Sequence, residues 1–398
     1  MGVCTAYYLT REEAYRDGDL DVILVEEGEI AGGASGKAAG FIARDWHGAP
    51  TRSLGELSWH LHDQLAAELG GDKAYGYRRV KSYSLDAKPA SQRRHVGASK
   101  PVSREANPSE MQAPTRALPH PQDWLSLPSG TEAAERTLGW LDSHSVTDLR
   151  ELGDEDTTAQ VTPELFVQTL WKECLAAGVK HVRGKAVGSK RNADGSVASI
   201  SVETGAHDTI PLATDKLLLA AGPWTGKVAQ SVLGVQVPIR ELAGHSIIYR
   251  PTEALPAEAI FAAVRDHGVT NGPEIFTRPD GTLYIAGENS GAPLPPGTST
   301  VTLSEPSVDR LKKCMAILSP AIAEGEIVSI NLCYRPITSS GYPFISPLSA
   351  VPNAWVCAGH GPWGITLAPG SGKVVSEMIL GKATKSADVS LLGLPRSS

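Results

Sequence analysis

The most concentrated set of chemically useful residues lies near the C-terminal end of the sequence, at 358–370. Glycines such as Gly359, Gly361 and Gly364 alternate there with one histidine, one tryptophan and two prolines. Glycine tolerates positive φ and lets the backbone approach a ligand closely. A structural turn does not need histidine, tryptophan and proline in this order. The segment therefore predicts a ligand-binding turn, with a helix following at 370–380.

A second glycine-rich run, at 30–40, consists of small residues around one cation. Ser35, Gly36 and Lys37 lie at its centre. Small side chains allow close backbone approach to a ligand, and the lysine supplies positive charge. An ordinary turn with an exposed lysine is the alternative.

Helices and strands are needed to position these two runs. Helical periodicity is found at 1–9, 54–69 and 163–177, and strand patterns are found at 21–26, 179–187, 199–204, 216–221, 244–249, 274–286 and 354–357. The strand at 21–26 is β-branched and ends in an acid, which is typical of a buried parallel strand. Asp280-Gly281, between two strand-like flanks, predicts a hairpin.

This order of elements predicts an α/β fold with two interleaved parts. A Rossmann-like dinucleotide-binding domain is expected from the discontinuous segments 1–47, 151–232 and 346–398. A mainly antiparallel α+β substrate domain, made of 48–150 and 233–345, is expected to be inserted into it.

Residues 88–130 have a different composition, with seven prolines in 43 residues. They are interpreted as a long surface insertion, because they cannot bury enough apolar area to offset the entropy of ordering. A lid over the active site or a partner-docking loop is the alternative.

Composition excludes several classes of protein. The 398 residues carry a net charge of -7, which offers no electrostatic footprint for nucleic acid or for an anionic membrane. No apolar run approaches the roughly 18 residues of a membrane span. The five cysteines are widely spaced without C-x-x-C, so we expect no metal cluster and a reducing, cytoplasmic location. P-loop, H-E-x-x-H and G-x-S-x-G motifs are all missing from the sequence.

The motifs together resemble a known family. Apart from the proline-rich insertion, nearly the whole chain is similar to FAD-dependent oxidoreductases of the D-amino-acid oxidase, glycine oxidase and sarcosine oxidase superfamily. The run at 35–41, followed by Asp45-Trp46, resembles the fungal and plant branch of that superfamily. Gly2 and the helix behind it resemble the end of the family's G-x-G-x-x-G fingerprint. The resemblance therefore predicts that a first strand and two phosphate-contacting glycines are missing before Met1.

The resemblance implies FAD as the cofactor. Glu26 is expected to accept the adenosine ribose hydroxyls, with a surface glutamate as the alternative. Ser35, Gly36 and Lys37 are expected to meet the pyrophosphate. Further cofactor contacts are implied for Gly2, Val187, Ala221, Gly222, Trp224, Cys333, Gly359, Gly361, Trp363, Gly364, Ile365 and Thr366. For Cys333 a covalent link to the flavin is possible, but a buried small residue beside non-covalent FAD is favoured.

The substrate side of the resemblance rests on the run at 333–343. It resembles the family's R-P-x-T-P-D-G-x-P-x-I, which implies that Arg335 binds the substrate carboxylate in a planar, bidentate pair. A structural arginine is the alternative, and the family's P-D is replaced here by Ser339-Ser340. Tyr334 and His360 are the other candidate catalytic residues.

The sequence lacks a residue that the resemblance associates with rapid use of oxygen. Sarcosine-oxidase-like members carry an oxygen-activating lysine in the hairpin at 281–287, and here Tyr284 is present without a lysine. Tyr284, Tyr249 and Tyr334 either line the pocket or belong to the core.

The sequence thus predicts an FAD-dependent enzyme that oxidises the C–N bond of a small amine or amino acid by hydride transfer to flavin N5. The electron acceptor is oxygen or another oxidant. A non-catalytic binding or scaffold protein with this fold, and a flavin dehydrogenase with a non-oxygen acceptor, are the alternatives.

Overall fold

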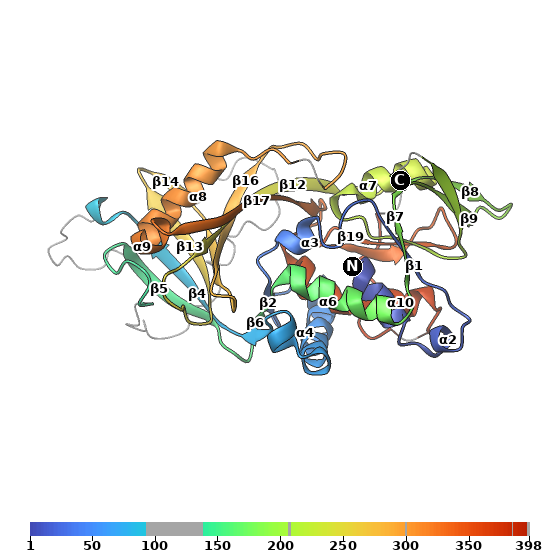
Figure 1. Ribbon diagram of the computed structural model, residues 1–398, viewed down its shortest axis with the longest axis horizontal. Helices are drawn as coiled ribbons and strands as arrows, with labels where there is room; N and C mark the ends of the chain where they lie inside the picture. Colours follow the sequence, from blue (N-terminus) through green and yellow to red (C-terminus); the bar gives the residue numbers. More distant parts are fainter. Residues whose placement is uncertain (93–137, 206–207, 299–300, 384, 396–398) are drawn as a thin grey trace, which may run out of the picture.

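The computed structural model describes residues 1–92, 138–205, 208–298, 301–383 and 385–395. Its two halves lie side by side along the long axis in Figure 1. From residue 93 onward, the proline-rich insertion predicted at 88–130 lies outside the described residues.

One half is built on an eight-stranded sheet with the order β17-β12-β16-β15-β13-β4-β5, and β14 pairs with β13. All neighbours are antiparallel except β4 and β13. Its strands are β4 (Lys81–Ala87), β5 (Val146–Gly153), β12 (Arg240–Arg250), β13 (Glu258–Asp266), β14 (Val269–Asn271), β15 (Glu274–Thr277), β16 (Leu283–Ser290) and β17 (Glu326–Ile337).

The two faces of this sheet have different partners. Helix α8 (Glu305–Leu318) and the short α9 (Pro320–Ala323) cover one face, where Leu311 and Met315 pack on apolar strand residues. The opposite face is turned towards the other half of the molecule, through an aromatic cluster that includes Phe41 and Phe261. The predicted hairpin is confirmed, because β15 and β16 pair antiparallel across Asp280-Gly281.

The second half contains four small sheets. Strand β1 (Ile23–Glu26) pairs in parallel with β7 (Lys180–Arg183), and β11 (Leu217–Leu219) pairs in parallel with β19 (Ala354–Ala358). The remaining strands pair antiparallel. Strand β18 (Phe344–Pro347) lies beside β19, and β8 (Lys185–Arg191), β9 (Val197–Glu203) and β10 (Thr209–Ala213) form a meander. The last sheet has the order β2 (Phe41–Ala43), β6 (Thr158–Gln160) and β3 (Arg78–Arg79).

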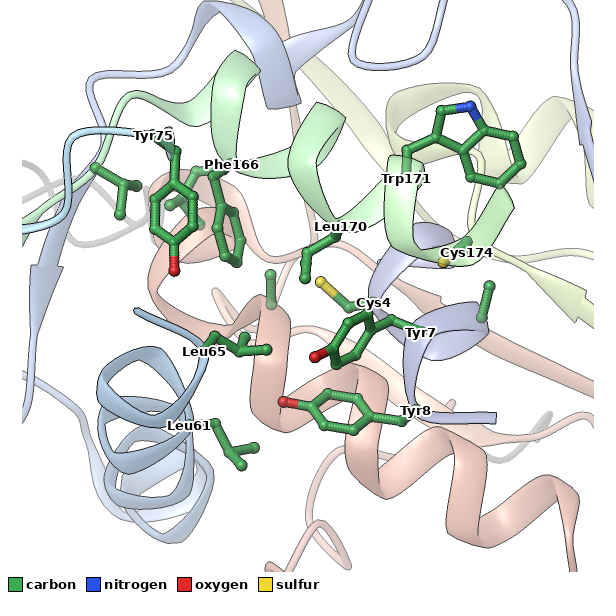
Figure 2. Packing of buried hydrophobic residues seen from close by; sticks show 14 of the residues in the cluster. Cys4, Tyr7, Tyr8, Leu61, Leu65, Tyr75, Phe166, Leu170, Trp171 and Cys174 are labelled. Atoms are coloured by element: carbon green, nitrogen blue, oxygen red, sulfur yellow. The ribbon is translucent and has the colours of Figure 1, made fainter. Parts of the chain in front are cut away.

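Four helices form the core of this half: α1 (Gly2–Leu9), α4 (Ala49–Leu69), α6 (Pro163–Ala176) and α10 (Gly364–Ile379). Figure 2 shows side chains of α1, α4 and α6 in one apolar cluster, with Tyr7 and Leu65 among its most buried members. The short helices are α2 (Glu13–Arg16), α5 (Gly71–Ala74), α7 (Thr225–Val228), η1 (Ala90–Gln92) and the π-helical η4 (Ala229–Leu233).

The packing of α4 differs from the predicted domain boundary. The sequence assigned residues 48–150 to the substrate domain, yet α4 lies against α10 and α1, in the half that the sequence assigned to FAD binding. The reason is its apolar stripe, in which Leu54, Trp59 and Leu65 are buried. The other predicted boundaries remain predictions.

Helix α10 begins earlier than predicted. The sequence indicated a start at Gly370, after Pro369, but the helix begins at Gly364 and contains Pro369. Proline has no N–H, so it leaves the carbonyl four residues before it, that of Ile365, without its helical donor. His62 Nε2 lies 3.0 Å from this carbonyl oxygen and supplies the missing hydrogen bond from α4.

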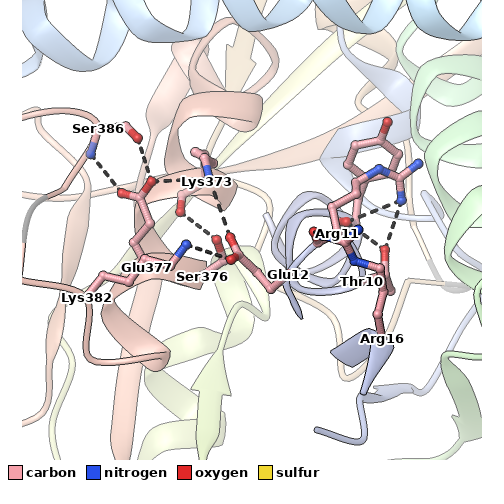
Figure 3. A network of polar contacts seen from close by, with 10 residues as sticks. Thr10, Arg11, Glu12, Arg16, Lys373, Ser376, Glu377, Lys382 and Ser386 are labelled. Atoms are coloured by element: carbon pink, nitrogen blue, oxygen red, sulfur yellow. Dashed lines mark hydrogen bonds and ion pairs between the residues drawn. The ribbon is translucent and has the colours of Figure 1, made fainter. Parts of the chain in front are cut away.

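A polar network holds the ends of α1 and α10 together (Figure 3). The carboxylate of Glu12 lies 2.6 Å from Lys382 Nζ and 3.5 Å from Lys373 Nζ. Lys373 also pairs with Glu377, whose carboxylate accepts hydrogen bonds from Ser386. Because these charges are mostly shielded from water, the network fixes the position of α10 relative to α1.

Candidate active site

The C-terminal part of β17 is the point where the two halves meet. It contacts α3 (Ala34–Lys37), η3 (Gly222–Trp224) and η5 (Gly361–Trp363). These three segments carry seven of the sixteen residues that the sequence singled out for cofactor binding. The fold therefore brings the glycine-rich runs to the strand that carries Arg335.

The Arg335 guanidinium lies across the sheet face rather than beside its own strand. Its Nη1 donates a 2.8 Å hydrogen bond to Asn289 Oδ1 on β16. Between them, on β12, is Gly244, where a Cβ would lie 2.6 Å from Arg335 Nη1. Only a glycine leaves room for the guanidinium to cross β12 at this height.

Strand register shows which residues share this face. Gly244 pairs with Asn289 and with Cys333, which is two residues from Arg335. A bulge between His245 and Ser246 interrupts the β12–β16 register here. Beyond the bulge, the same face continues through Ser246, Ala286, Tyr284, Glu274, Phe276 and Phe261.

Tyr334 does not join this group. Side chains alternate between the faces of a strand, so Tyr334 points away from Arg335. It is buried with Ala243, Leu294 and Leu332 in a separate apolar cluster. Tyr249 also lies away from this face, in the cluster beneath α8. Of the three tyrosines, the structure brings only Tyr284 to the site.

Segment α3 is fastened to the sheet by three contacts. Lys37 Nζ donates to the Leu332 carbonyl at 3.3 Å, and the Tyr284 hydroxyl donates to the Lys37 carbonyl at 3.2 Å. Arg278 lies over the Tyr284 ring at 4.9 Å and donates to the Ala38 carbonyl. The lysine ammonium thus faces β17 in this structure, and its contact with a phosphate stays a prediction.

Cys333 is half-buried on the Arg335 face. Burial raises the pKa of its thiol, although the Arg335 and Lys37 cations act in the opposite direction. The thiolate is the reactive form of cysteine, so this environment favours an unreactive thiol.

His360 is buried in the glycine-rich turn that leads into η5 and α10. The residue is 3% exposed, and its Nε2 lies 3.0 Å from Ser371 Oγ on α10. Burial, and then the nearby N-terminal ammonium of the chain, lower the pKa of His360 to about 3. The side chain is therefore neutral at physiological pH and joins the glycine-rich turn to α10, and its catalytic role stays a prediction.

Comparison with known proteins decides the family. The family described as FAD dependent oxidoreductase (DAO) matches residues 1–378. The chain belongs to this family.

Relatives and solved structures agree with this assignment. A Schizosaccharomyces pombe protein named as an oxidoreductase is 29% identical over 98% of this chain and 94% of its own length. The D-amino acid dehydrogenase of Xanthobacter autotrophicus is 26% identical over 96% of this chain and 94% of its own length. Glycine oxidase of Geobacillus kaustophilus has a similar fold, with a TM-score of 0.71 and 19% identity over 100% of this chain and 96% of that one.

The protein is therefore an FAD-dependent oxidoreductase with an α/β, Rossmann-like FAD-binding fold, as the sequence predicted. In the part of the chain that the structure describes, no helix is long and apolar enough to cross a membrane. The same residues contain no group of three or more His, Cys, Asp or Glu side chains suited to a metal ion.

The residues present fit an anionic dinucleotide. Glu26 ends the parallel strand β1, and its Oε1 accepts a hydrogen bond from the Gly28 N–H at 2.9 Å. Among the described residues no cation pairs with it, so its other oxygen is free for a ribose hydroxyl. Neither α1, beginning at Gly2, nor α10, beginning at Gly364, has a side-chain cap. Uncapped helix N-termini attract negative charge, as a pyrophosphate or a reduced flavin requires.

The other predicted FAD contacts surround this region. Trp224, which follows Ala221 and Gly222, donates from Nε1 to the Pro295 carbonyl at 2.8 Å and lies beside Gly33. Val187 is partly exposed on β8. Around the start of α10, the predicted contacts Gly359 and Gly361 have positive φ, and Trp363 packs edge-on against His47. Within α10, the Ile365 carbonyl accepts a hydrogen bond from His62, and the Thr366 hydroxyl donates one to the Phe41 carbonyl. Their contacts with FAD stay predictions.

Sequence reasoning missed three residues of the site: Gly244, Asn289 and Glu274. None belongs to a motif, because each acts through its place in the sheet. Glu274 carried a usable signal, since it is an acid at the start of the apolar strand β15. Gly244 and Asn289 become meaningful only when the register places them beside Arg335.

Proposed function

We propose that this protein oxidises the C–N bond of a small amino acid, with Arg335 binding the substrate carboxylate. The observation that carries the proposal is the Arg335 guanidinium, held over Gly244 by Asn289 on the sheet face next to α3, η3 and η5. A guanidinium fixed in this way through Nη1 keeps its Nε/Nη2 edge for a planar carboxylate pair.

The residues around Arg335 supply binding and orientation. When bound, FAD supplies the chemistry, by accepting a hydride from the substrate Cα–H. Arg335 fixes the carboxylate, which limits the ways in which the Cα–H can face the cofactor. Phe41, Trp46 and Phe261 pack with ring centroids 5.1 to 5.3 Å apart and form an apolar wall beside the site. The product imine is expected to hydrolyse to an oxo acid, and oxygen or another oxidant is the final acceptor.

We also propose that FAD binds without a covalent bond. The support is the raised pKa of the Cys333 thiol, which disfavours the thiolate that would attack the flavin. Denaturing the yellow protein should then release all of its flavin into solution.

The role of Arg335 is tested by the substitution Arg335→Met in the FAD-loaded protein. Loss of one partner of a desolvated charge pair raises KM for an amino acid by about 100-fold. KM for an amine without a carboxylate should change little. Steady-state assays with an artificial electron acceptor measure both constants.

The exposed Arg240 at the start of β12 provides the matched control, Arg240→Met, which should leave both KM values unchanged. An unaltered amino-acid KM in Arg335→Met would contradict carboxylate binding by this residue and leave a structural role.

A further inference from the structure

Glu274 is a second charged group on the Arg335 face of the sheet. It begins β15, where it pairs with Ala286 on β16 and with Phe261 on β13. Since Asn289 lies three residues beyond Ala286, with the bulge between them, Glu274 is one strand further from Arg335 than Asn289 is.

The Glu274 carboxylate is half-buried but has no direct partner within the described ranges. It accepts no hydrogen bond there, and no cation lies within 4.0 Å of it. Of the charged groups that the structure describes, Arg335 is the one that acts on it electrostatically. A carboxylate that is partly desolvated without a partner is costly, so its retention beside the substrate anchor points to a ligand group of opposite charge.

Two opposing effects act on the protonation of Glu274. Burial raises the pKa of the Glu274 carboxyl, and the Arg335 guanidinium counteracts this rise. Its neighbour on β13, Phe261, has no charge. Arg335 and Cys333 of β17 and Tyr284 of β16 are the titratable groups on the same sheet face, and Lys37 of α3 and Arg278 contact Tyr284.

We propose that Glu274 receives the amino group of the substrate and accepts one of its protons. The inference rests on the proposed function, because it requires the substrate carboxylate at Arg335. In the step, one N–H bond of the substrate ammonium breaks and one O–H bond forms on Glu274. The nitrogen keeps the electron pair of the broken bond as a lone pair, and nothing is oxidised or reduced.

Substrate binding itself promotes this proton transfer. Before binding, the positive charge of Arg335 stabilises the Glu274 carboxylate. Once the substrate carboxylate pairs with Arg335, that stabilisation weakens and Glu274 becomes a better proton acceptor. The resulting neutral amine has the lone pair that must assist departure of hydride from the neighbouring carbon. A zwitterionic amino acid therefore matches the two charges of the site and is activated by them.

Two unreactive ligands that differ only in the amino group test the proposal. α-Aminoisobutyrate carries a carboxylate and an ammonium but no Cα–H, and isobutyrate lacks the ammonium. Their equilibrium binding to the FAD-loaded protein is followed by the change in flavin absorbance, so no turnover is needed. The variants are Glu274→Gln and, as a control, Glu326→Gln, which removes an exposed carboxylate at the far end of β17.

Glu274→Gln should weaken α-aminoisobutyrate binding by at least about tenfold, the effect of one lost charge-assisted hydrogen bond. Isobutyrate should bind to Glu274→Gln with unchanged or higher affinity. Glu326→Gln should bind both ligands as the wild-type protein does. Equal responses of the two ligands to Glu274→Gln would overturn the role of Glu274 while leaving Arg335 intact. If neither ligand binds the wild-type protein, carboxylate binding at Arg335 fails, and the role of Glu274 fails with it.

Discussion

At the scale of single residues, the site depends on a glycine as much as on an arginine. The Arg335 guanidinium occupies the space that any other residue at position 244 would fill, with the Gly244 Cβ position 2.6 Å from Nη1 and 3.0 Å from Cζ. Asn289 accepts the hydrogen bond that keeps the guanidinium in this place. The orientation of the substrate anchor is therefore set by the backbone of the neighbouring strand.

Gly244→Ala should displace the Arg335 guanidinium from Asn289. KM for an amino acid should rise roughly tenfold or more, because the carboxylate pair is no longer aligned. Thermal stability should stay close to that of the wild type, because Gly244 has no positive φ in the structure. Steady-state kinetics and a thermal melt measure the two effects.

A glycine on another strand provides the control. Gly188→Ala adds a methyl group on β8, where nothing lies within 4 Å of the new Cβ, and should change neither quantity. Equal KM values for Gly244→Ala and the wild type would show that the space over Gly244 is not needed.

Residue types allowed part of this site to be predicted from the sequence. The chemistry of Arg335 and the small residues around Lys37 indicated binding groups, and the fold brings both to β17. Tyr334 was attributed to the site from its place in the motif, but alternation along the strand turns it away. Glu274 lies 61 positions before Arg335 and could not be connected to it without the strand order of the sheet.

At the scale of elements, α4 supplies hydrogen-bond partners to the backbone of α10 near Pro369. Pro369 interrupts the hydrogen bonds of α10, and α4 repairs them with two side chains. His62 Nε2 donates to the Ile365 carbonyl, and Ser58 Oγ accepts from the Gly370 N–H at 3.1 Å. This is why the sequence prediction of a helix starting after Pro369 was wrong: the compensating side chains lie some 300 residues away in the chain.

His62→Leu should destabilise the protein near neutral pH by about 1–3 kcal/mol, because the buried Ile365 carbonyl loses its donor. Urea unfolding gives the apparent free energy of unfolding. His60→Leu, an exposed position on the same helix, is the control and should have an effect near zero.

The same variant should change the acid sensitivity. Burial lowers the pKa of His62 to about 4, below its value of 6.5 without the fold, so the unfolded chain takes up a proton first as pH falls. Wild-type stability should decrease by up to about 3 kcal/mol from this group between roughly pH 6.5 and 4. The free energy of unfolding of His62→Leu should not show this part of the decrease. If the free energies of unfolding of the two proteins fell in parallel with pH, the predicted contribution of His62 would be contradicted.

At the scale of the whole molecule, the chain passes repeatedly between the two halves (Figure 1). The alternation of strand and helix patterns predicted interleaved parts and a dinucleotide-binding domain, and the family resemblance implied FAD. It could not assign α4, because an amphipathic helix shows an apolar face without showing what covers it. The aromatic cluster of Phe41, Trp46 and Phe261 closes the junction and lies next to the proposed substrate site.

The central claim is that the junction of the two halves oxidises amino acids on a bound FAD. The most direct measurement is an anaerobic titration of the FAD-loaded protein with single amino acids, followed by the visible absorbance of the flavin. At least one amino acid should bleach the wild-type flavin, and Arg335→Met should need about 100-fold more of it. Failure of every amino acid to bleach the flavin would contradict the claim and favour a non-catalytic role for this fold.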